Sequence, residues 1–237
     1  MFSKRASAAF SVIVLVCSGC HSKGAHSYKD DPKLTPLMNA ARYNDLPRVR
    51  TLLAEGADVK ARTVQGETAL YEAVYRADQS SDNLPVVDAL LNAGADPNEK
   101  GFTSLLALSL DIYGNPSVTL RLLQRGARVP QECPPQNADD SLVSLATQQS
   151  SIDVIRELIV RGSPVNCQFR GATALYWAAL NGQYDRVELL IDSGADLSQR
   201  ELDAANTSNS DPRVQGAFAK TRQLLKEALK AKELKTK

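Results

Sequence analysis

The chain has 237 residues, of which 43% are hydrophobic and only 5% aromatic, and its 28 Lys and Arg nearly balance 27 Asp and Glu. A formal charge of +1 argues against a general nucleic-acid binder, which needs surplus basic residues to neutralise phosphates. The two histidines, His21 and His26, lie near the N-terminus. A mechanism that needs a histidine in the body of the protein is therefore excluded.

Residues 1–19 have the pattern of a secretory signal peptide, because Lys4 and Arg5 precede a short apolar run. The run is shorter than the ~20 residues that span a bilayer. The alternative, a buried core helix, lacks the amphipathic period and the cap that such a helix would show.

Ser18-Gly19-Cys20 resembles the cleavage box of bacterial lipoproteins, although Cys17 stands where that family usually has Leu. The resemblance implies that Cys20 is acylated, and two or more acyl chains anchor a protein stably in a membrane. His21 follows Cys20 in place of the Asp that favours inner-membrane retention, so we expect an outer-membrane anchor facing the periplasm. Residues 20–33 are polar and are expected to form a flexible tether.

Residues 34–200 contain about five repeats of one pattern. Each repeat has an opening Thr or Ser, an aliphatic doublet and a closing glycine. The opening segments are Thr35-Pro36-Leu37, Thr68-Ala69-Leu70, Thr103-Ser104-Leu105, Ser141-Leu142-Val143 and Thr173-Ala174-Leu175. The core leucines expected from the doublets are Leu52, Leu90, Leu122, Leu158 and Leu189, and the closing glycines are Gly56, Gly94, Gly126, Gly162 and Gly194.

This pattern resembles the ankyrin repeat, Thr-Pro-Leu-His-x-Ala-Ala followed by Val-x-x-Leu-Leu-x-x-Gly-Ala-Asp. The resemblance implies an all-α solenoid of helix–turn–helix units joined by short hairpin loops and stabilised by stacking between neighbours. The four opening threonines are expected to cap the first helices, and the glycines to end the second helices in the left-handed conformation. The family histidine is replaced in every unit, by Met38, Tyr71, Leu106, Ser144 and Tyr176.

Three segments depart from the pattern. The second unit has extra residues between Ala73 and Pro85, which predict one more helical turn and a longer loop. The third unit predicts an unusually apolar first helix over 105–113. The proline-containing loop 130–137 is predicted to be the least regular part of the array.

Residues 201–237 are expected to form a C-terminal capping repeat with a basic helix that begins at Pro212. Apolar residues recur at helical spacing on one face of this helix, and basic residues occupy the other face: Lys220, Arg222, Lys226, Lys230 and Lys232. A terminal repeat with a polar outer face lets a solenoid end in water. A helix that binds a membrane or a partner is the alternative.

The sequence has no arrangement typical of an enzyme. No glycine-rich phosphate loop with Lys-Ser/Thr occurs, and no Cys or His spacing typical of zinc ligands survives processing. The adjacent acidic pairs, Asp30-Asp31 and Asp139-Asp140, are interpreted as solvated loop residues. We therefore expect no catalytic residues, no metal, no cofactor and no small-molecule substrate.

Two cysteines, Cys133 and Cys167, would remain after processing, at similar places in neighbouring loops. An oxidising periplasm favours a disulfide between them. Neighbouring repeat elements are roughly 10 Å apart, whereas a disulfide needs Cα atoms within about 7 Å. A bridge thus requires the long loop near Cys133 to bend, and free, partly buried thiols are the alternative.

The ankyrin resemblance implies that a partner protein binds the inner face of the first helices and the loop tips. By positional match, the candidate inner-face residues are Arg42, Tyr43, Tyr75, Arg76, Leu110, Asp111, Gln148, Gln149, Leu180 and Asn181. The candidate tips are Val64, Gln65, Glu99, Lys100, Phe169 and Arg170. Tyr and Arg are enriched among residues that dominate binding energy, although an ordinary solvated surface is the alternative reading of any one position.

Residues 20–211 contain 18 basic and 25 acidic residues, so a partner with a basic face is favoured. The resemblances together predict a lipid-anchored, periplasmic protein-binding module. By analogy with small envelope immunity proteins, we expect it to sequester a secreted antibacterial toxin such as a lipase. A scaffold for a resident envelope protein, for example an oxidative-stress enzyme, is the alternative.

Overall fold

The computed structural model describes residues 31–75, 82–99, 103–110, 115–133, 141–206 and 212–235. The regular elements of these residues are helices, and Phe169 and Ala172 form an isolated bridge, so the predicted all-α repeat fold is confirmed. The helices are α1 (Pro36–Arg42), α2 (Leu46–Ala54), α3 (Ala69–Tyr75), α4 (Leu84–Asn92), α5 (Leu105–Leu108), α6 (Pro116–Gln124), α7 (Leu142–Gln149), α8 (Ile152–Val160), α9 (Ala174–Leu180), α10 (Tyr184–Asp192), α11 (Gln199–Asn206) and α12 (Pro212–Lys235). The predicted signal peptide and Cys20 lie outside the described residues.

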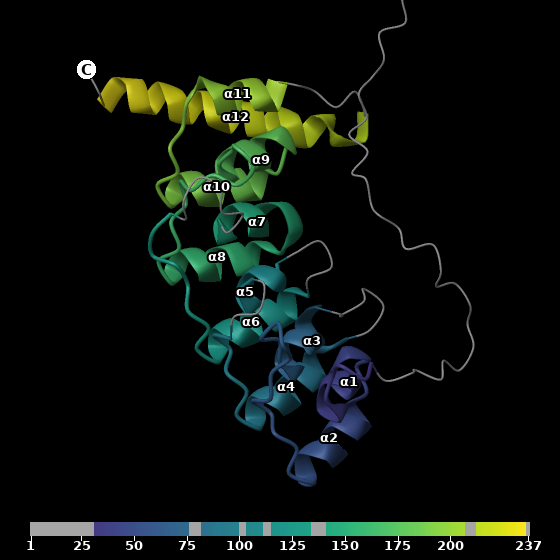
Figure 1. Ribbon diagram of the computed structural model, residues 1–237. Helices are drawn as coiled ribbons and strands as arrows, with labels where there is room; N and C mark the ends of the chain where they lie inside the picture. Colours follow the sequence, from purple (N-terminus) through teal and green to yellow (C-terminus); the bar gives the residue numbers. More distant parts are fainter. Residues whose placement is uncertain are drawn as a thin grey trace, which may run out of the picture.

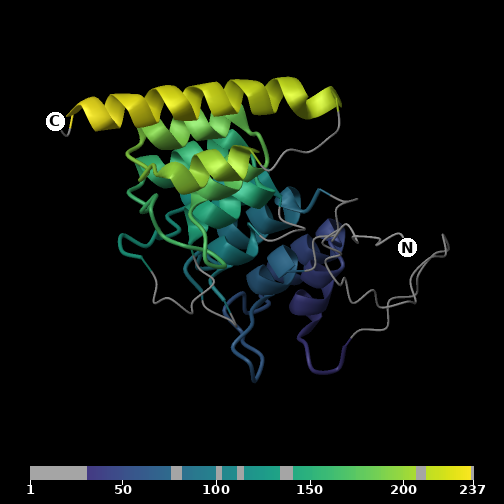
Figure 2. The same cartoon turned by 90° about the horizontal axis from the view of Figure 1, so that it is seen from above.

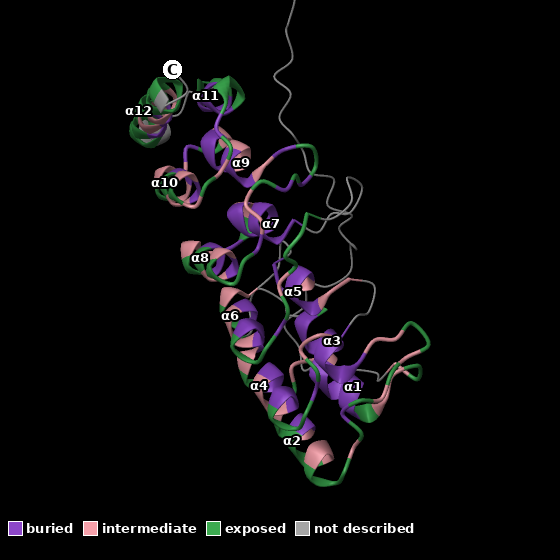
Figure 3. Ribbon diagram, turned by 90° about the vertical axis from the view of Figure 1, so that its left-hand side faces the viewer, coloured by how far each residue is buried: buried purple, intermediate pink, exposed green. Residues whose placement is uncertain are grey.

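The helices stack as pairs along one axis (Figure 1). The first helix of each pair has an odd number, and these helices, α1 to α11, form one layer. The even-numbered second helices form the other layer (Figure 3). Buried residues gather where the two layers meet, which is where apolar side chains leave water. The long helix α12 lies across the end of the stack (Figure 2).

Side-chain hydroxyls cap the first helices α1, α3, α5 and α9, whereas Ser141 before α7 makes no capping hydrogen bond. Thr35 accepts a hydrogen bond from the backbone N–H of Met38 at 3.2 Å, and Thr68 and Thr173 make the matching bonds in their units. In the third unit the prediction of Thr103 was wrong. Ser104 is the capping residue and accepts from the backbone of Ala107, so this unit is shifted by one position relative to the predicted register.

The closing glycines lie where second helices end, and all five have φ between +84° and +94°. The leucine four positions before each glycine faces the core, and it is fully buried in four units: Leu90, Leu122, Leu158 and Leu190. The choice of Leu189 in the fifth unit was wrong by one position. Leu52, in the first unit, is only half-buried because an end unit has a neighbour on one side only.

Of the two predicted irregular helices, the structure tests one. Helix α3 is described as far as Tyr75, and 76–81 lie outside the described residues, so the predicted extra helical turn and longer loop of the second unit stay a prediction. The predicted first helix over 105–113 is a four-residue helix, α5, and 111–113 lie outside the described part of the chain.

Helix α12 covers the last regular unit with its apolar face. Phe218, Thr221 and Leu225 are buried, and the ring of Phe218 lies so close to Gly182 that a Cβ atom there would be 2.9 Å away. The Lys232 ammonium donates to the carbonyl of Leu197 at 2.9 Å, while Lys220, Lys226 and Lys230 are exposed. Helix α12 thus buries one face against the array and turns a polar, basic face to solvent.

Candidate partner-binding face

The inner face is here the surface formed by the C-terminal ends of the first helices. The structure places seven of the predicted residues there: Arg42, Tyr43, Tyr75, Gln148, Gln149, Leu180 and Asn181. Arg76 and Asp111, also predicted, lie outside the described residues. Because these seven residues end helices or directly follow them, a rigid backbone fixes their positions.

The N-terminal part of the inner face combines a fixed arginine with an exposed tyrosine. Arg42 forms ion pairs with Asp31 at 3.3 Å and with the buried Glu72 at 3.6 Å. Tyr75 is 53% exposed, and its ring stacks on the buried Tyr71 with 5.9 Å between ring centroids. The stack restricts the Tyr75 side chain while leaving much of its surface available to a partner.

Asp31 belongs to the predicted tether but contacts α1. Its backbone N–H donates to Asn39 Oδ1 at 2.9 Å, and Asn39 Nδ2 donates back to the carbonyl of Asp31 at 3.0 Å. Two hydrogen bonds and the Arg42 ion pair hold this residue. Here the array begins before the predicted end of the tether at residue 33.

The C-terminal part of the inner face is more polar. Gln149 and Asn181 are exposed, and the Asn181 amide donates to the carbonyl of Trp177 at 3.0 Å. Gln148 and Leu180 are half-buried. Trp177 is also half-buried near this surface and was not predicted as a site residue, although it is the single tryptophan of the sequence.

Three of the predicted contact residues are buried and cannot meet a partner directly. Leu110 is 1% exposed, because the one-position shift of the third unit turns it into the core. Phe169 is 5% exposed and belongs to the hydrophobic core. Glu99, predicted at a loop tip, is 5% exposed, and Lys100 beside it is not described.

Burial raises the pKa of Glu99 above its ordinary value. A hydrogen bond from Thr68 and the positive charge of Arg62, 3.9 Å away, oppose this shift without cancelling it. Taking a carboxylate out of water disfavours its charged form. We therefore interpret Glu99 as a residue that supports its own loop and not as a residue that contacts a partner.

The hairpin around Phe169 and Arg170 is held by residues that the sequence analysis missed. Trp177 Nε1 donates to the carbonyl of Phe169 at 3.2 Å, and Arg200 Nη2 donates to that of Gly171 at 3.0 Å. Arg170 is exposed, has φ of +51°, and its guanidinium lies 5.0 Å from the Phe169 ring centroid. No spacing in the sequence connects Arg200 to this hairpin, which explains why it was missed.

The loop after the first unit presents an apolar tip. Val64 is 97% exposed and Gln65 beside it is exposed, as predicted for a tip. Arg62 Nη1 donates to the carbonyl of Gly66 at 2.8 Å, and the backbone of Thr63 pairs with Glu67 at 2.9 Å. These bonds fix the loop that carries the exposed valine.

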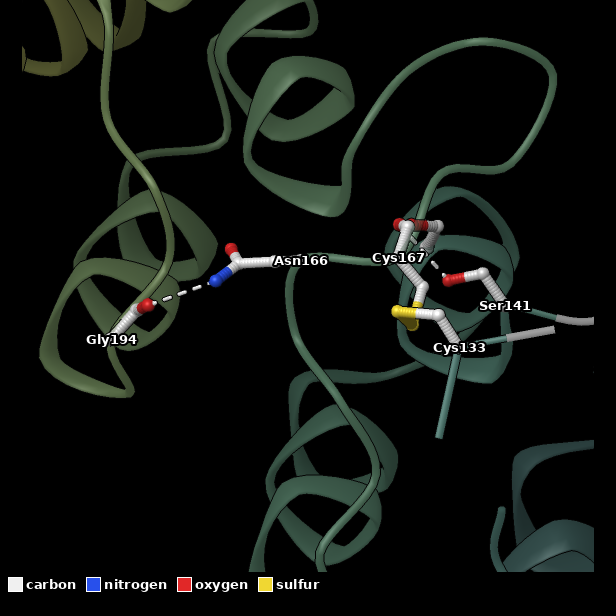
Figure 4. Close-up of a disulfide and its surroundings, with 6 residues drawn as sticks. Cys133, Ser141, Asn166, Cys167 and Gly194 are labelled. Carbon is white, nitrogen blue, oxygen red and sulfur yellow. Dashed lines mark hydrogen bonds between the residues drawn. A yellow bond between two sulfur atoms is a disulfide. The ribbon is translucent and has the colours of Figure 1, made fainter. Parts of the chain in front are cut away.

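A disulfide joins Cys133 to Cys167, with 5.2 Å between their Cα atoms (Figure 4). Cys133 is exposed in the segment between α6 and α7, and Cys167 is buried in the segment between α8 and α9. From the sequence alone, two free thiols were the alternative to this bridge. The approach of the Cys133 loop brings the two residues within bridging distance.

The described residues offer little chemistry. They contain no group of three or more His, Cys, Asp and Glu side chains arranged to hold a metal ion. Among the helices that the structure describes, none combines the length and the apolar character needed to cross a membrane. A shallow groove of about 510 Å³ lies between α2 and α4, on the layer opposite the inner face, and is lined in part by Leu53, Leu84 and Pro85.

A family model described as ankyrin repeats (3 copies) matches residues 7–101 and 105–201. The mitochondrial disaggregase of Bos taurus is 35% identical over 178 residues, which cover 74% of this chain and 21% of that protein. The mitochondrial disaggregase of Homo sapiens is 32% identical over 201 residues, or 78% of this chain and 26% of that protein. The chain thus spans about a quarter of the length of these relatives.

A bacterial protein is similar over a shorter stretch. YahD of Escherichia coli (strain K12), whose name describes an ankyrin repeat protein, is 38% identical over 63 residues. This match covers 26% of the present chain and 31% of YahD.

Proposed function

Because the chain belongs to the ankyrin-repeat family, whose repeats indicate protein–protein interaction, we propose that it is a non-enzymatic module that binds a partner protein on its inner face. The observation that carries this proposal is Tyr75, an aromatic side chain that is half exposed and held by a stacked neighbour. Tyrosine gives a large contact area and loses little conformational entropy when it is already restrained. Arg42 and Tyr43, one unit earlier, extend the same surface.

We propose that the module works in the bacterial periplasm, anchored to the outer membrane through an acylated Cys20. The resemblance of Ser18-Gly19-Cys20 to a lipoprotein cleavage box supports the anchor. The disulfide between Cys133 and Cys167 supports an oxidising compartment, because such bridges persist mainly outside the reducing cytosol. Mass spectrometry of the protein purified from bacterial envelopes tests the anchor: an acylated N-terminal Cys20 is expected, and an intact N-terminus contradicts it.

The partner we propose is a secreted antibacterial toxin such as a lipase, which the array holds inactive as an immunity protein does. A resident inhibitor needs an anchor and a rigid surface and no chemistry of its own. The excess of acidic residues in 20–211 supports a toxin with a basic face, since complementary charge accelerates encounter. A scaffold for a resident envelope protein is the second candidate, supported by the same surface and anchor.

The binding surface is tested by affinity capture from envelope extracts with the full chain and with a Tyr43→Ala, Tyr75→Ala double variant. We expect the double variant to recover its partner at least about tenfold less efficiently, since a loss of 1.4 kcal/mol corresponds to that factor. Val160→Ala, an equally simple truncation of a side chain that is 76% exposed on α8, is the matched control. Undiminished capture by the double variant would show that the inner face is not the binding surface.

The two candidate roles are separated by growth competition. Bacteria that lack the protein should be killed by toxin-secreting neighbours and rescued by the full chain if it is an immunity protein. A scaffold would leave survival unchanged in that competition while still yielding a captured partner.

A further inference from the structure

The third unit is the point where the array is least regular. Its first helix, α5, has four residues, whereas α7 has eight and α9 has seven. A repeat array is held together by the interfaces between neighbouring units, so a short helix offers less surface to the unit on each side. The array therefore consists of an N-terminal half, α1–α4, and a C-terminal half, α7–α12, that meet through a short unit.

Asparagine side chains join neighbouring loops elsewhere in the array. Asn98 Nδ2 donates to the carbonyl of Gly126 at 3.1 Å, and Asn166 Nδ2 donates to that of Gly194 at 3.3 Å (Figure 4). Each asparagine also accepts from a backbone N–H of the next unit, at 2.7 Å and 2.8 Å. These paired bonds connect the second unit to the third and the fourth unit to the fifth.

The connection between the third and fourth units is built differently. Pro130 stands four residues after its closing glycine, where the second and fourth units have Asn98 and Asn166 and the first has Lys60, and its side chain has no donor or acceptor. The neighbouring Gln131 makes one exposed bond to the carbonyl of Arg161, at 3.1 Å. The disulfide follows two residues later, at the place where the asparagine pairing is missing.

The far end of the bridge is fixed to the fourth unit. The carbonyl of Cys167 accepts from Ser141 Oγ at 3.2 Å and from Ser144 Oγ at 2.9 Å, and both hydroxyl groups are buried at the start of α7 (Figure 4). Cys133 belongs to the segment that leaves the third unit. The bridge thus ties the short unit directly to the first helix of the C-terminal half.

We propose that the Cys133–Cys167 disulfide is a covalent clamp that couples the two halves into one cooperative array, and that a dithiol reductant uncouples them. A reductant thiolate attacks the exposed Cys133 sulfur and displaces Cys167, and the second reductant thiol then displaces Cys133. The S–S bond is replaced by two S–H groups, and the reductant becomes a cyclic disulfide. The N-terminal half then unfolds first, because α11 and α12 cap the other half.

The single tryptophan makes this separation measurable. Trp177 lies in the C-terminal half, so its fluorescence reports that half, while far-ultraviolet circular dichroism reports helices in both. We would heat the full chain, with Cys17→Ser and Cys20→Ser so that only the bridge responds, in the presence and absence of dithiothreitol. The oxidised protein should give coincident midpoints, and in the reduced protein the helix signal should fall at least about 5 °C before the fluorescence changes.

The Cys133→Ala, Cys167→Ala variant is the matched control and should show separated midpoints with or without dithiothreitol. Coincident midpoints in the reduced protein would overturn the proposal. Complete unfolding on reduction would also overturn it, because the bridge would then hold the whole fold and not one junction. If dithiothreitol separated the two midpoints further in the double-alanine variant, which has no bridge, the change would come from the reductant itself, and the proposal would be contradicted.

Discussion

Helices α9 and α5 occupy the same place in their units, yet they differ in length, register and surroundings. Helix α9 begins after Thr173, runs for seven residues and buries Leu175 completely. Helix α5 begins after Ser104, one position later than its pattern predicts, and ends after four residues. Leu110 follows it and is buried, although the pattern places it on the surface.

The difference between these units shows where repeat landmarks are informative. In a unit whose capping threonine and closing glycine are unambiguous, the unit stacks on regular neighbours. The place of a residue in the repeat then predicts whether its side chain is buried. Where two hydroxyl residues stand together, as Thr103 and Ser104 do, the local sequence permits two registers. Packing then decides between them, and every side chain in the helix changes its direction.

The largest expected effects come from core leucines of the two units. Leu175→Ala should lower the free energy of unfolding by about 3 kcal/mol, since leucine-to-alanine changes in cores cost about 2–5 kcal/mol. Leu110→Ala should cost at least about 2 kcal/mol, because this side chain is as buried as a core residue. Chemical denaturation measures both free-energy changes. A cost below about 0.5 kcal/mol for Leu110→Ala would show that the Leu110 side chain lies on the surface and not in the core.

The next effect concerns a half-buried arginine, Arg186, that joins the fourth and fifth units. Arg186 Nη2 donates to the carbonyl of Ser150 at 2.7 Å, and Nη1 donates to that of Thr147, at the C-terminal end of α7. Arg186→Met should cost about 1–3 kcal/mol, since it leaves these carbonyls without donors. Arg156→Met, on the exposed part of α8, should change the denaturation midpoint very little. Equal effects of both changes would contradict this role of Arg186.

The capping residues test the register of the third unit directly. Thr173→Ala and Ser104→Ala should each cost about 1 kcal/mol, the typical price of a lost N-cap hydrogen bond. Thr103→Ala should cost less than about 0.5 kcal/mol because it caps no helix in the structure. Thermal unfolding compares the stability of the three variants. A larger loss of stability for Thr103→Ala than for Ser104→Ala would show that the predicted register is the correct one.

The smallest expected effect is a pH dependence at Glu99. Its pKa is raised in the folded state, so the folded protein binds this proton more tightly than the unfolded chain does. The stability linked to this proton is present below the unfolded pKa and is lost as pH rises through the raised folded pKa. Glu99→Gln should therefore be more stable than the parent at neutral pH, and the difference should shrink as pH falls through the raised folded pKa and be smallest below about pH 4, where Glu99 is protonated in both states. A variant that is less stable at neutral pH would contradict this account.

The fold was predictable from the sequence because the opening threonines and closing glycines recur with a local physical meaning. The inner face was predictable only in part. Tyr75 is exposed as its position implies, whereas Leu110 and Phe169 are buried by register and by hairpin packing. Local spacing contains no information about which loops approach each other. For this reason it left the pairing of Cys133 and Cys167 open and missed the contact of Arg200 with the Phe169 hairpin.

The central claim, that the inner face binds a partner protein, is tested most directly by photo-crosslinking in living bacteria. A photoreactive amino acid at position 75 lies on the inner face, and the same residue at position 160 lies exposed on the opposite layer. We expect a crosslinked product with a second protein from position 75 and none from position 160. Crosslinking from position 160 alone, or from neither position, would contradict it.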